Sequence, residues 1–157
     1  MEMTAEPQAA SPVDARPTVV FADDDEVMRC LLGIQLQQAF DFTGMAANAD
    51  EAIDVVRAKR PDVAVLDVNM PGGGARRAID EIRRCSPETA IVILAGDETH
   101  ETVVDLLLHG AEAYLRKGID AATLAKQLTF AIEAHRHRRT LGAAGRVDAT
   151  TAGANPC

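Results

Sequence analysis

Three short apolar segments rich in β-branched residues, each bounded by charged or turn-forming residues, stand out along the chain. They cover residues 18–22 (TVVFA), 63–66 (VAVL) and 90–95 (AIVILA). Their length and composition are typical of buried β-strands. Weaker segments of the same kind at 42–47 and 113–116 predict two further strands.

The stretches between these segments repeat apolar residues every three or four positions, as amphipathic helices do. The faces expected to be buried are formed by Val27, Leu31, Ile34 and Phe40 in a first helix, Ile53 and Val56 in a second, Ala78 and Ile82 in a third, Val103, Val104, Leu107 and Leu108 in a fourth, and Leu124, Leu128, Ala131 and Ile132 in a fifth. Asn48 and Asp120 are placed to cap the second and fifth helices, and Gly110 to end the fourth.

Strand and helix therefore alternate five times along the chain. This alternation predicts a doubly wound α/β fold with a five-stranded parallel sheet, right-handed crossovers and helices on both faces. In open sheets of this kind, the functional site lies beyond the carboxyl ends of the strands.

The two ends of the chain differ from this central region. Residues 1–17 contain three prolines and few apolar side chains, and residues 140–157 are small, polar and rich in Gly and Ala. We expect both segments to be disordered, on either side of one domain over residues 18–139. Too few residues follow this domain for a second one, which favours a stand-alone module. The alternative is that the helix over 123–139, with His135 and His137 on its surface, leads into an output domain of a longer parent chain.

Composition narrows the class of function. The 157 residues carry a net charge of −8, with no Trp, one Tyr and four Phe. This argues against direct binding of nucleic acid or of an anionic membrane, which need positive charge. The three cysteines lack metal-binding spacing, and neither a signal peptide nor a membrane-spanning segment is recognisable. We therefore expect a cytoplasmic protein.

Charged side chains gather where the strands end. Asp23, Asp24 and Asp25 follow the first strand, Asp67 ends the third in chain order, and Lys117 follows the fifth. Each feature alone is compatible with a solvated turn, but their joint placement favours a site. Crowded carboxylates need a counter-charge, and Mg²⁺ prefers such oxygen ligands. A carboxylate beside Mg²⁺ and a lysine can accept a phosphoryl group as an aspartyl phosphate.

Four motifs resemble the receiver domain of bacterial two-component response regulators, whose fold is like that of the chemotaxis regulator. They are FADDDEVMR at 21–29, PDVAVLDVNMPGGG at 61–74, IVILAG at 91–96 and GAEAYLRKG at 110–118. The resemblance extends over residues 18–139. It implies a flavodoxin-like sheet with strand order 2-1-3-4-5 and a non-enzymatic signalling role.

The resemblance also implies a role for individual residues. Asp67 matches the phospho-acceptor and Lys117 the lysine that contacts the phosphoryl oxygens. The residues expected to hold Mg²⁺ are Asp24 directly, Asp23 through a water molecule, Asp67, and Asn69 through its backbone carbonyl. The side chains of Asn69 and Asp97 match positions that tune dephosphorylation, and Ala95 and Tyr114 match the two switch positions.

Ala95 and Gly118 are the main departures from the family pattern. Ala95 stands where most receivers have Ser or Thr, so a hydroxyl that would bind the phosphoryl group is missing. Gly118 stands where many receivers have Pro after the lysine. We expect the phosphorylation chemistry to be intact and the switch to be atypical.

The resemblance predicts that a sensor histidine kinase or histidine phosphotransfer protein supplies the phosphoryl group. Output would pass through protein–protein contacts, with a possible homodimer through the fourth helix, fifth strand and fifth helix. One alternative is a degenerate receiver that binds partners without phosphorylation. Another is a haloacid-dehalogenase-like phosphatase using the Asp-x-Asp spacing of Asp23 and Asp25, although 157 residues leave no room for its cap domain.

Overall fold

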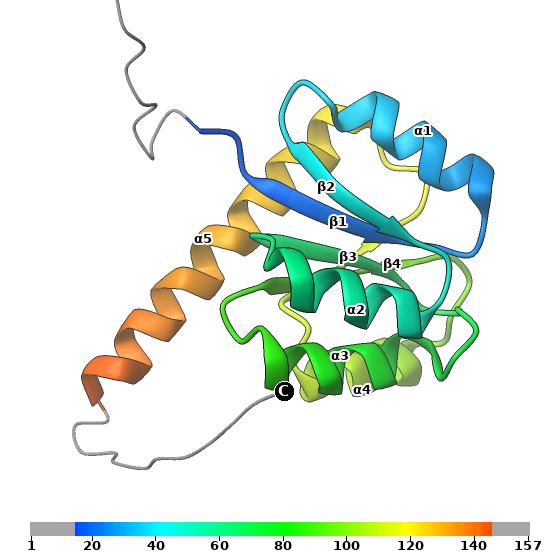
Figure 1. Ribbon diagram of the computed structural model, residues 1–157. Coiled ribbons are helices and arrows are strands. Elements are labelled where there is room, and N and C mark those ends of the chain that lie inside the picture. The colour runs from blue at the N-terminus through cyan, green and yellow to red at the C-terminus, as the bar shows by residue number, and fades with distance from the viewer. Residues whose placement is uncertain (1–14, 146–157) are drawn as a thin grey trace, which may run out of the picture.

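Five parallel strands form one sheet in the order β2-β1-β3-β4-β5, and Figure 1 labels the first four of them. The computed structural model describes residues 15–145. In chain order the elements are β1 (Thr18–Ala22), α1 (Glu26–Leu36), β2 (Asp41–Ala46), α2 (Ala49–Lys59), β3 (Val63–Asp67), α3 (Gly74–Cys85), β4 (Ala90–Ala95), α4 (His100–His109), β5 (Ala113–Arg116) and α5 (Ala121–Gly145). The doubly wound fold and its strand order are as the sequence predicted.

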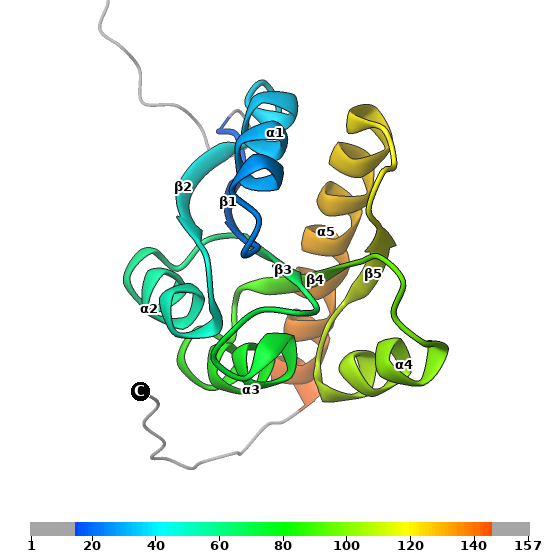
Figure 2. The same cartoon turned by 90° about the vertical axis from the view of Figure 1, so that its right-hand side faces the viewer.

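Helices cover both faces of the sheet, with α1 and α5 on one face and α2, α3 and α4 on the other (Figure 2). Each face has its own hydrophobic core, because alternate residues of a strand point to opposite sides. Val65 and Leu94 belong to the core under α1 and α5, whereas Leu66 and Ile93 belong to the core on the other face. The central strands are therefore apolar throughout.

The position of a strand in the sheet explains how clearly the sequence marked it. Every residue of β3 and β4 is buried, since both strands lie inside the sheet. The edge strands β2 and β5 contain mostly half-buried or exposed residues. These edges are the two segments with the weaker apolar pattern.

Helix α1 packs through a different face from the one predicted. Leu32 and Leu36 are its buried residues, whereas Val27, Leu31 and Ile34 are 73%, 46% and 66% exposed. Both sets have helical spacing, so periodicity alone could not choose between two apolar stripes on one helix. The prediction was wrong for Val27, Leu31 and Ile34, whereas Phe40 is buried as expected, although it lies after the helix ends.

The fourth helix was predicted in part, and the fifth correctly. In α4, Val103 is buried as expected, but Leu106 takes the place of Leu108, which is 80% exposed. In α5, the four residues expected in the core are all buried. Asp120 caps α5, since its carboxylate accepts the Thr123 backbone N–H at 2.8 Å.

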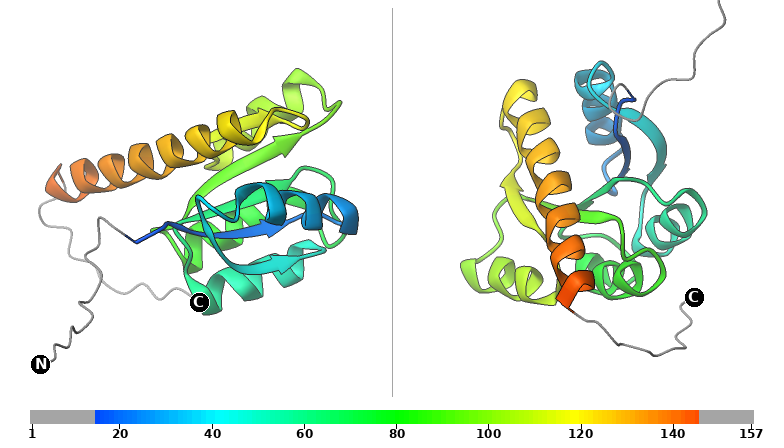
Figure 3. Two further views of the ribbon diagram at one scale, coloured as in Figure 1. Left: turned by 90° about the horizontal axis from the view of Figure 1, so that it is seen from above. Right: turned by 90° about the vertical axis from the view of Figure 1, so that its left-hand side faces the viewer.

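The fifth helix continues to Gly145, so residues 140–145 are helical and do not belong to a disordered tail. Figure 3 shows its last turns extending past the end of the sheet at which the strands begin. The other residues for which disorder was predicted at the two ends, 1–14 and 146–157, lie outside the described part of the chain. None of the described helices combines the length and apolar character needed to cross a membrane.

His135 is buried, contrary to expectation. Its Nδ1 lies 2.9 Å from a carboxylate oxygen of Glu112, which precedes β5, and its Nε2 lies 2.8 Å from the carbonyl of Pro87, which precedes β4. The same Glu112 is ion-paired with Arg138 on α5. These contacts fasten α5 to the ends of two strands at which the chain enters the sheet.

Candidate functional site

The carboxyl ends of β1, β3 and β5 bring the predicted site residues to one edge of the sheet. Ala22 at the end of β1 pairs with Leu66, so Asp23 and Asp67 follow at the same level. On the other side of β4, Ala95 pairs with Arg116, and the next residue is Lys117. The topology therefore brings together side chains that are up to 94 residues apart in sequence.

Three carboxylates form the floor and rim of this site. Oxygens of Asp23, Asp24 and Asp67 lie within 4.8 Å of one another. Asp23 and Asp67 are buried, at 0% and 4% exposure, whereas Asp24 is exposed. Buried carboxylates at this separation repel each other and favour a neighbouring positive charge.

Lys117 supplies one such charge. Its Nζ lies 2.8 Å from Oδ1 of Asp67 and 3.2 Å from Oδ2 of Asp23. Burial would lower the pKa of Lys117, but the hydrogen bonds and negative charges of these two aspartates outweigh it and raise the pKa above its ordinary value. Lys117 is therefore a cation at neutral pH, and the carboxylates of Asp23 and Asp67 share its single charge.

The electrostatic environment of Asp67 disfavours its charged form. Burial raises the pKa of Asp67, and the negative charges of Asp23 and Asp24 raise it further, while the hydrogen bond from Lys117 lowers it in part. The net direction is upward. A second positive charge at this place would relieve that cost.

The site fits a divalent cation with oxygen ligands. Oδ1 of Asp23 accepts the backbone N–H of Asp25 at 2.9 Å, which fixes the carboxylate. Its other oxygen, Oδ2, is buried and accepts no hydrogen bond, although it lies at ion-pair distance from Lys117. Apart from this ion pair the oxygen has room for a further partner, and a hard cation such as Mg²⁺ would provide one.

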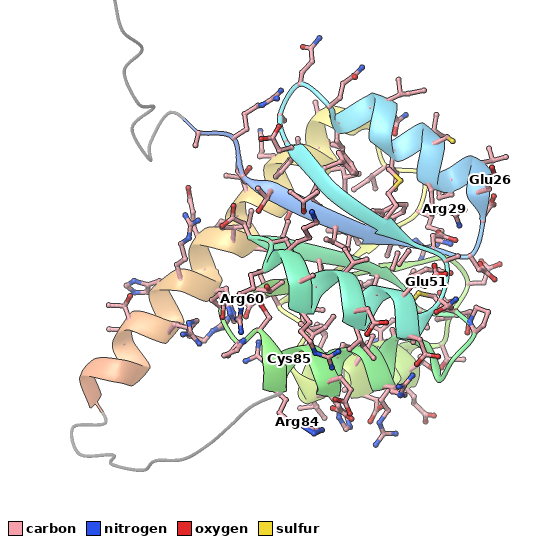
Figure 4. The ribbon with its side chains drawn as sticks, viewed as in Figure 1. Glu26, Arg29, Glu51, Arg60, Arg84 and Cys85 are labelled. Atoms are coloured by element: carbon pink, nitrogen blue, oxygen red, sulfur yellow. The ribbon has the colours of Figure 1, made fainter. Side chains whose placement is uncertain are left out.

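Asp25 belongs to the helix and not to the carboxylate group. Its Oδ1 accepts the backbone N–H of Val27 at 2.9 Å and that of Met28 at 3.4 Å, so it is the N-cap of α1. One helical turn further on, Arg29 donates from its guanidinium to the carbonyl of Asp23 at 2.7 Å. Figure 4 shows Arg29 at the same end of the molecule as the carboxyl edge of the sheet. Asp25 and Arg29 thus hold the loop that carries Asp23 and Asp24.

A comparison with protein families identifies this arrangement. The model of the response regulator receiver domain matches residues 19–129, which is most of the described chain. The chain belongs to the response regulator receiver domain family.

Two curated relatives agree with this assignment. The nitrate/nitrite response regulator NarL of Escherichia coli K12 is 32% identical over 113 residues, covering 71% of this chain and 52% of NarL. The DNA-binding transcriptional activator DevR/DosR of Mycobacterium tuberculosis is 36% identical over 112 residues, covering 69% of this chain and 51% of that protein. The chain thus spans about half the length of these curated relatives.

A solved structure has the same fold. A CheY-like receiver domain protein from Methanospirillum hungatei JF-1 superposes with a TM-score of 0.72 over 79% of this chain and 99% of its own, at 18% identity. At this identity the likeness establishes the fold alone. The loops and side chains around the site are therefore described from this chain's own residues.

The loop after β3 carries the receiver's Asn69 on its surface. Asn69 is exposed, and its side-chain amide donates to Oε2 of Glu98 at 2.6 Å. The three glycines that follow, Gly72, Gly73 and Gly74, all have positive φ, between 72° and 105°, which residues with a Cβ rarely adopt. The predicted metal-binding role of the Asn69 backbone carbonyl stays a prediction.

Ala95 and Tyr114 are the two residues predicted to occupy the switch positions of the family. Ala95 is 3% exposed, offers no hydroxyl, and accepts the backbone N–H of Lys117 through its carbonyl at 2.9 Å. Tyr114 is 42% exposed on the edge strand β5, so its ring lies at the surface. Asp97, the second residue expected to tune dephosphorylation, is exposed in the loop after β4.

Gly118 follows the receiver's lysine with φ +99°. Proline cannot adopt this angle because its ring holds φ near −65°. The glycine at this position therefore allows a backbone conformation that the proline of many receivers would exclude.

Sequence reasoning missed one residue at this edge, Glu98. Its carboxylate accepts the backbone N–H of Gly96 at 2.6 Å as well as the Asn69 amide. Glu98 belongs to no recognisable motif, and only the approach of the two loops in the folded chain reveals its position.

Proposed function

We propose that this receiver domain accepts a phosphoryl group on Asp67 in a Mg²⁺-dependent reaction and passes the signal on by protein contact. The observation that carries the proposal is the position of the Asp67 carboxylate. It is buried at the carboxyl edge, 2.8 Å from the Lys117 ammonium and within 4.8 Å of two further carboxylates. A structural role alone does not call for so costly a cluster of like charges.

The donor in this proposal is the phosphohistidine of a sensor kinase or phosphotransfer protein. Lys117 binds Oδ1 of Asp67, which leaves Oδ2 for attack on phosphorus. The new Oδ2–P bond forms as the P–N bond breaks, and the electron pair of that bond returns to the imidazole nitrogen. Lys117 remains protonated because its pKa is raised, so its N–H groups are available to the phosphoryl oxygens.

Asp23, Asp24 and Asp67 would hold the Mg²⁺, with the backbone carbonyl of Asn69 as the further expected ligand. Bound there, the cation would neutralise charge on the phosphoryl oxygens. Asp25 and Arg29 keep the Asp23–Asp24 loop in place by capping α1 and binding the Asp23 carbonyl. The chain's own contribution is thus a prearranged set of oxygens beside one fixed ammonium.

The output surface in this proposal is formed by α4, β5 and α5. Val104, Leu108, Tyr114 and Phe130 are 38%, 80%, 42% and 67% exposed there. Exposed apolar side chains of this size are typical of protein contacts, including contacts between two copies of a chain. Two described cysteines, Cys30 and Cys85, are free thiols, which suits the reducing cytoplasm that the proposal assumes.

The test begins with purified protein, Mg²⁺ and acetyl phosphate, followed by a phosphate-affinity gel. We expect a shifted band that is absent in Asp67→Asn and in the presence of EDTA. Beryllofluoride, which mimics the phosphoryl group, is added separately and its binding measured by calorimetry. A protein that binds neither Mg²⁺ nor beryllofluoride would refute the proposal. The result would favour a receiver that binds partners without phosphorylation, which the missing hydroxyl at Ala95 makes an alternative.

A further inference from the structure

Glu98 connects the two loops that border the proposed phosphorylation site. It lies in the loop between β4 and α4, and it is partly buried. One oxygen of its carboxylate accepts the backbone N–H of Gly96, and the other accepts the side-chain amide of Asn69, each at 2.6 Å. Hydrogen bonds to an ionised carboxylate are stronger than those between neutral groups. Glu98 therefore links Gly96, after β4, to Asn69, after β3, and we call these two hydrogen bonds the Glu98 bridge.

The N–H of Gly96 is placed for an anion. Gly96 follows Ala95, the last residue of β4, and β4 lies between the strand that carries Asp67 and the strand that leads to Lys117. The carbonyl of Ala95 is already engaged by the backbone N–H of Lys117. In a trans peptide the next N–H points opposite to this carbonyl, so the Gly96 N–H points away from β5, and a carboxylate oxygen of Glu98 occupies it.

The missing hydroxyl at Ala95 makes the contact between Glu98 and the Gly96 N–H more important. Without a hydroxyl at this position, the loop after β4 has no side-chain donor from residue 95 for a phosphoryl oxygen. The backbone N–H of Gly96 is then the donor that the loop can offer. Glu98 and a phosphoryl group on Asp67 are both anions that need this donor.

We propose that Glu98 is a built-in competitor of the phosphoryl group: it occupies the Gly96 N–H in the unphosphorylated chain and is displaced when Asp67 is phosphorylated. The inference rests on the proposed function of Asp67. Displacement breaks the bond to Gly96 and, because one carboxylate makes both contacts, also frees the side chain of Asn69. The event that loosens the loop after β4 is thus the departure of an acidic side chain.

The affinity for beryllofluoride in saturating Mg²⁺ tests the competition. We expect Glu98→Ala to bind beryllofluoride about tenfold more tightly than the wild type, the ratio that one charge-assisted hydrogen bond supplies. Glu98→Asp keeps the charge but is one methylene shorter, so it cannot span both partners and should also bind more tightly. Glu101→Ala removes an acidic residue from the first turn of α4, outside the bridge, and should match the wild type.

An amide spectrum checks the contact without metal or phosphate. The Gly96 N–H, bonded to a carboxylate, should resonate downfield in the wild type and move upfield in Glu98→Ala. Gly96→Ala assigns the signal by removing it from the glycine region, and a Cβ there meets nothing within 4 Å. Addition of Mg²⁺ and beryllofluoride to the wild type should shift the Gly96 signal and the Asn69 side-chain amide together.

The outcomes separate the two proposals. If the wild type binds beryllofluoride and Glu98→Ala and Glu98→Asp bind it no more tightly, the competition is refuted and the phospho-acceptor role of Asp67 stands. If only Glu98→Ala binds more tightly, loss of charge explains the result and the bridge is likewise refuted. If the wild type binds neither Mg²⁺ nor beryllofluoride, the proposed function fails and this inference fails with it.

Discussion

Lys117 and Asp67 are ion-paired across the edge of the sheet, with 2.8 Å between Nζ and Oδ1. The lysine thus occupies, before any metal or phosphoryl group arrives, one oxygen of the residue proposed to accept phosphate. It also lies 3.2 Å from Asp23. Lys117 and a divalent cation consequently compete for the same carboxylates, although both are needed for the proposed reaction.

This competition predicts opposite effects of Lys117→Gln on two measurements. Phosphorylation by acetyl phosphate should be lost, because no ammonium remains for the phosphoryl oxygens. Mg²⁺ affinity should rise about five- to tenfold, since about 1 kcal/mol of repulsion at this range is removed. Calorimetry with Mg²⁺ alone measures the second effect. Lys126→Gln on α5, which removes an equal charge outside the site, should leave both unchanged, and weaker Mg²⁺ binding in Lys117→Gln would contradict the prediction.

The pKa of Asp67 predicts how stability depends on pH. A carboxyl group whose pKa is raised in the folded state adds stability below its unfolded pKa and loses it as pH rises through the folded pKa. At neutral pH, Asp67→Asn should therefore be more stable than the wild type, with a melting temperature about 2–4 °C higher. The gain should shrink as the pH is lowered toward the unfolded pKa.

Thermal melts followed by circular dichroism at pH 7.5 and at pH 4 give the difference in melting temperature between Asp67→Asn and the wild type at each pH. Mg²⁺ should stabilise the wild type more than Asp67→Asn, because the variant has one carboxylate fewer for the cation. A variant that is less stable than the wild type at pH 7.5 without metal would show that the Lys117 contact outweighs burial and repulsion.

His135 predicts a large stability effect far from the site. His135→Ala removes two hydrogen-bond contacts of a buried side chain and leaves a cavity between α5 and the sheet. We expect a loss of about 2–4 kcal/mol in the free energy of unfolding, measured by urea denaturation. His137→Ala, two residues away on the exposed face of the same helix, should change it by less than about 0.5 kcal/mol. Equal effects of the two variants would contradict the structure around His135.

Restoring a hydroxyl at position 95 should have opposite effects on two quantities: the affinity for beryllofluoride and the stability of the unliganded domain. Ala95→Ser places a hydroxyl at a buried position where it can reach a phosphoryl oxygen, so beryllofluoride should bind about tenfold more tightly. In the unliganded domain the same hydroxyl adds a polar group to a buried position and should lower stability by about 1 kcal/mol. Calorimetry and urea denaturation measure the two effects. Unchanged binding of beryllofluoride would show that residue 95 does not face the phosphoryl group.

The sequence predicted those parts of the site that depend on strand ends. Asp23, Asp67 and Lys117 each follow or end an apolar run, and a doubly wound topology brings such positions to one edge. Asp25 could not be separated from Asp24 in this way, because its role as the N-cap of α1 depends on where the helix begins. Glu98 was missed for a stronger reason: its partners, Gly96 and Asn69, lie in two loops whose approach no local pattern records.

Packing choices on helices were also beyond the sequence. Helix α1 carries two apolar stripes of helical spacing, and the sheet selects the one with Leu32 and Leu36. His135 looked like a surface residue because its neighbours are basic and polar, yet its ring is enclosed by Pro87 and Glu112 from distant parts of the chain. Tertiary contacts decided both cases.

The length of α5 has a mechanical consequence. The helix has 25 residues, or about 37 Å, and begins four residues after Lys117. His135 and Arg138, near the middle of the helix, anchor it to Glu112, and its last turns lie past the opposite end of the sheet (Figure 3). With this anchor as the pivot, the helix beyond His135 extends about 15 Å, so a tilt of about 5° would move its last turn by about 1 Å. A small rearrangement around a single ammonium could thus be read on the side of the molecule opposite the chemistry.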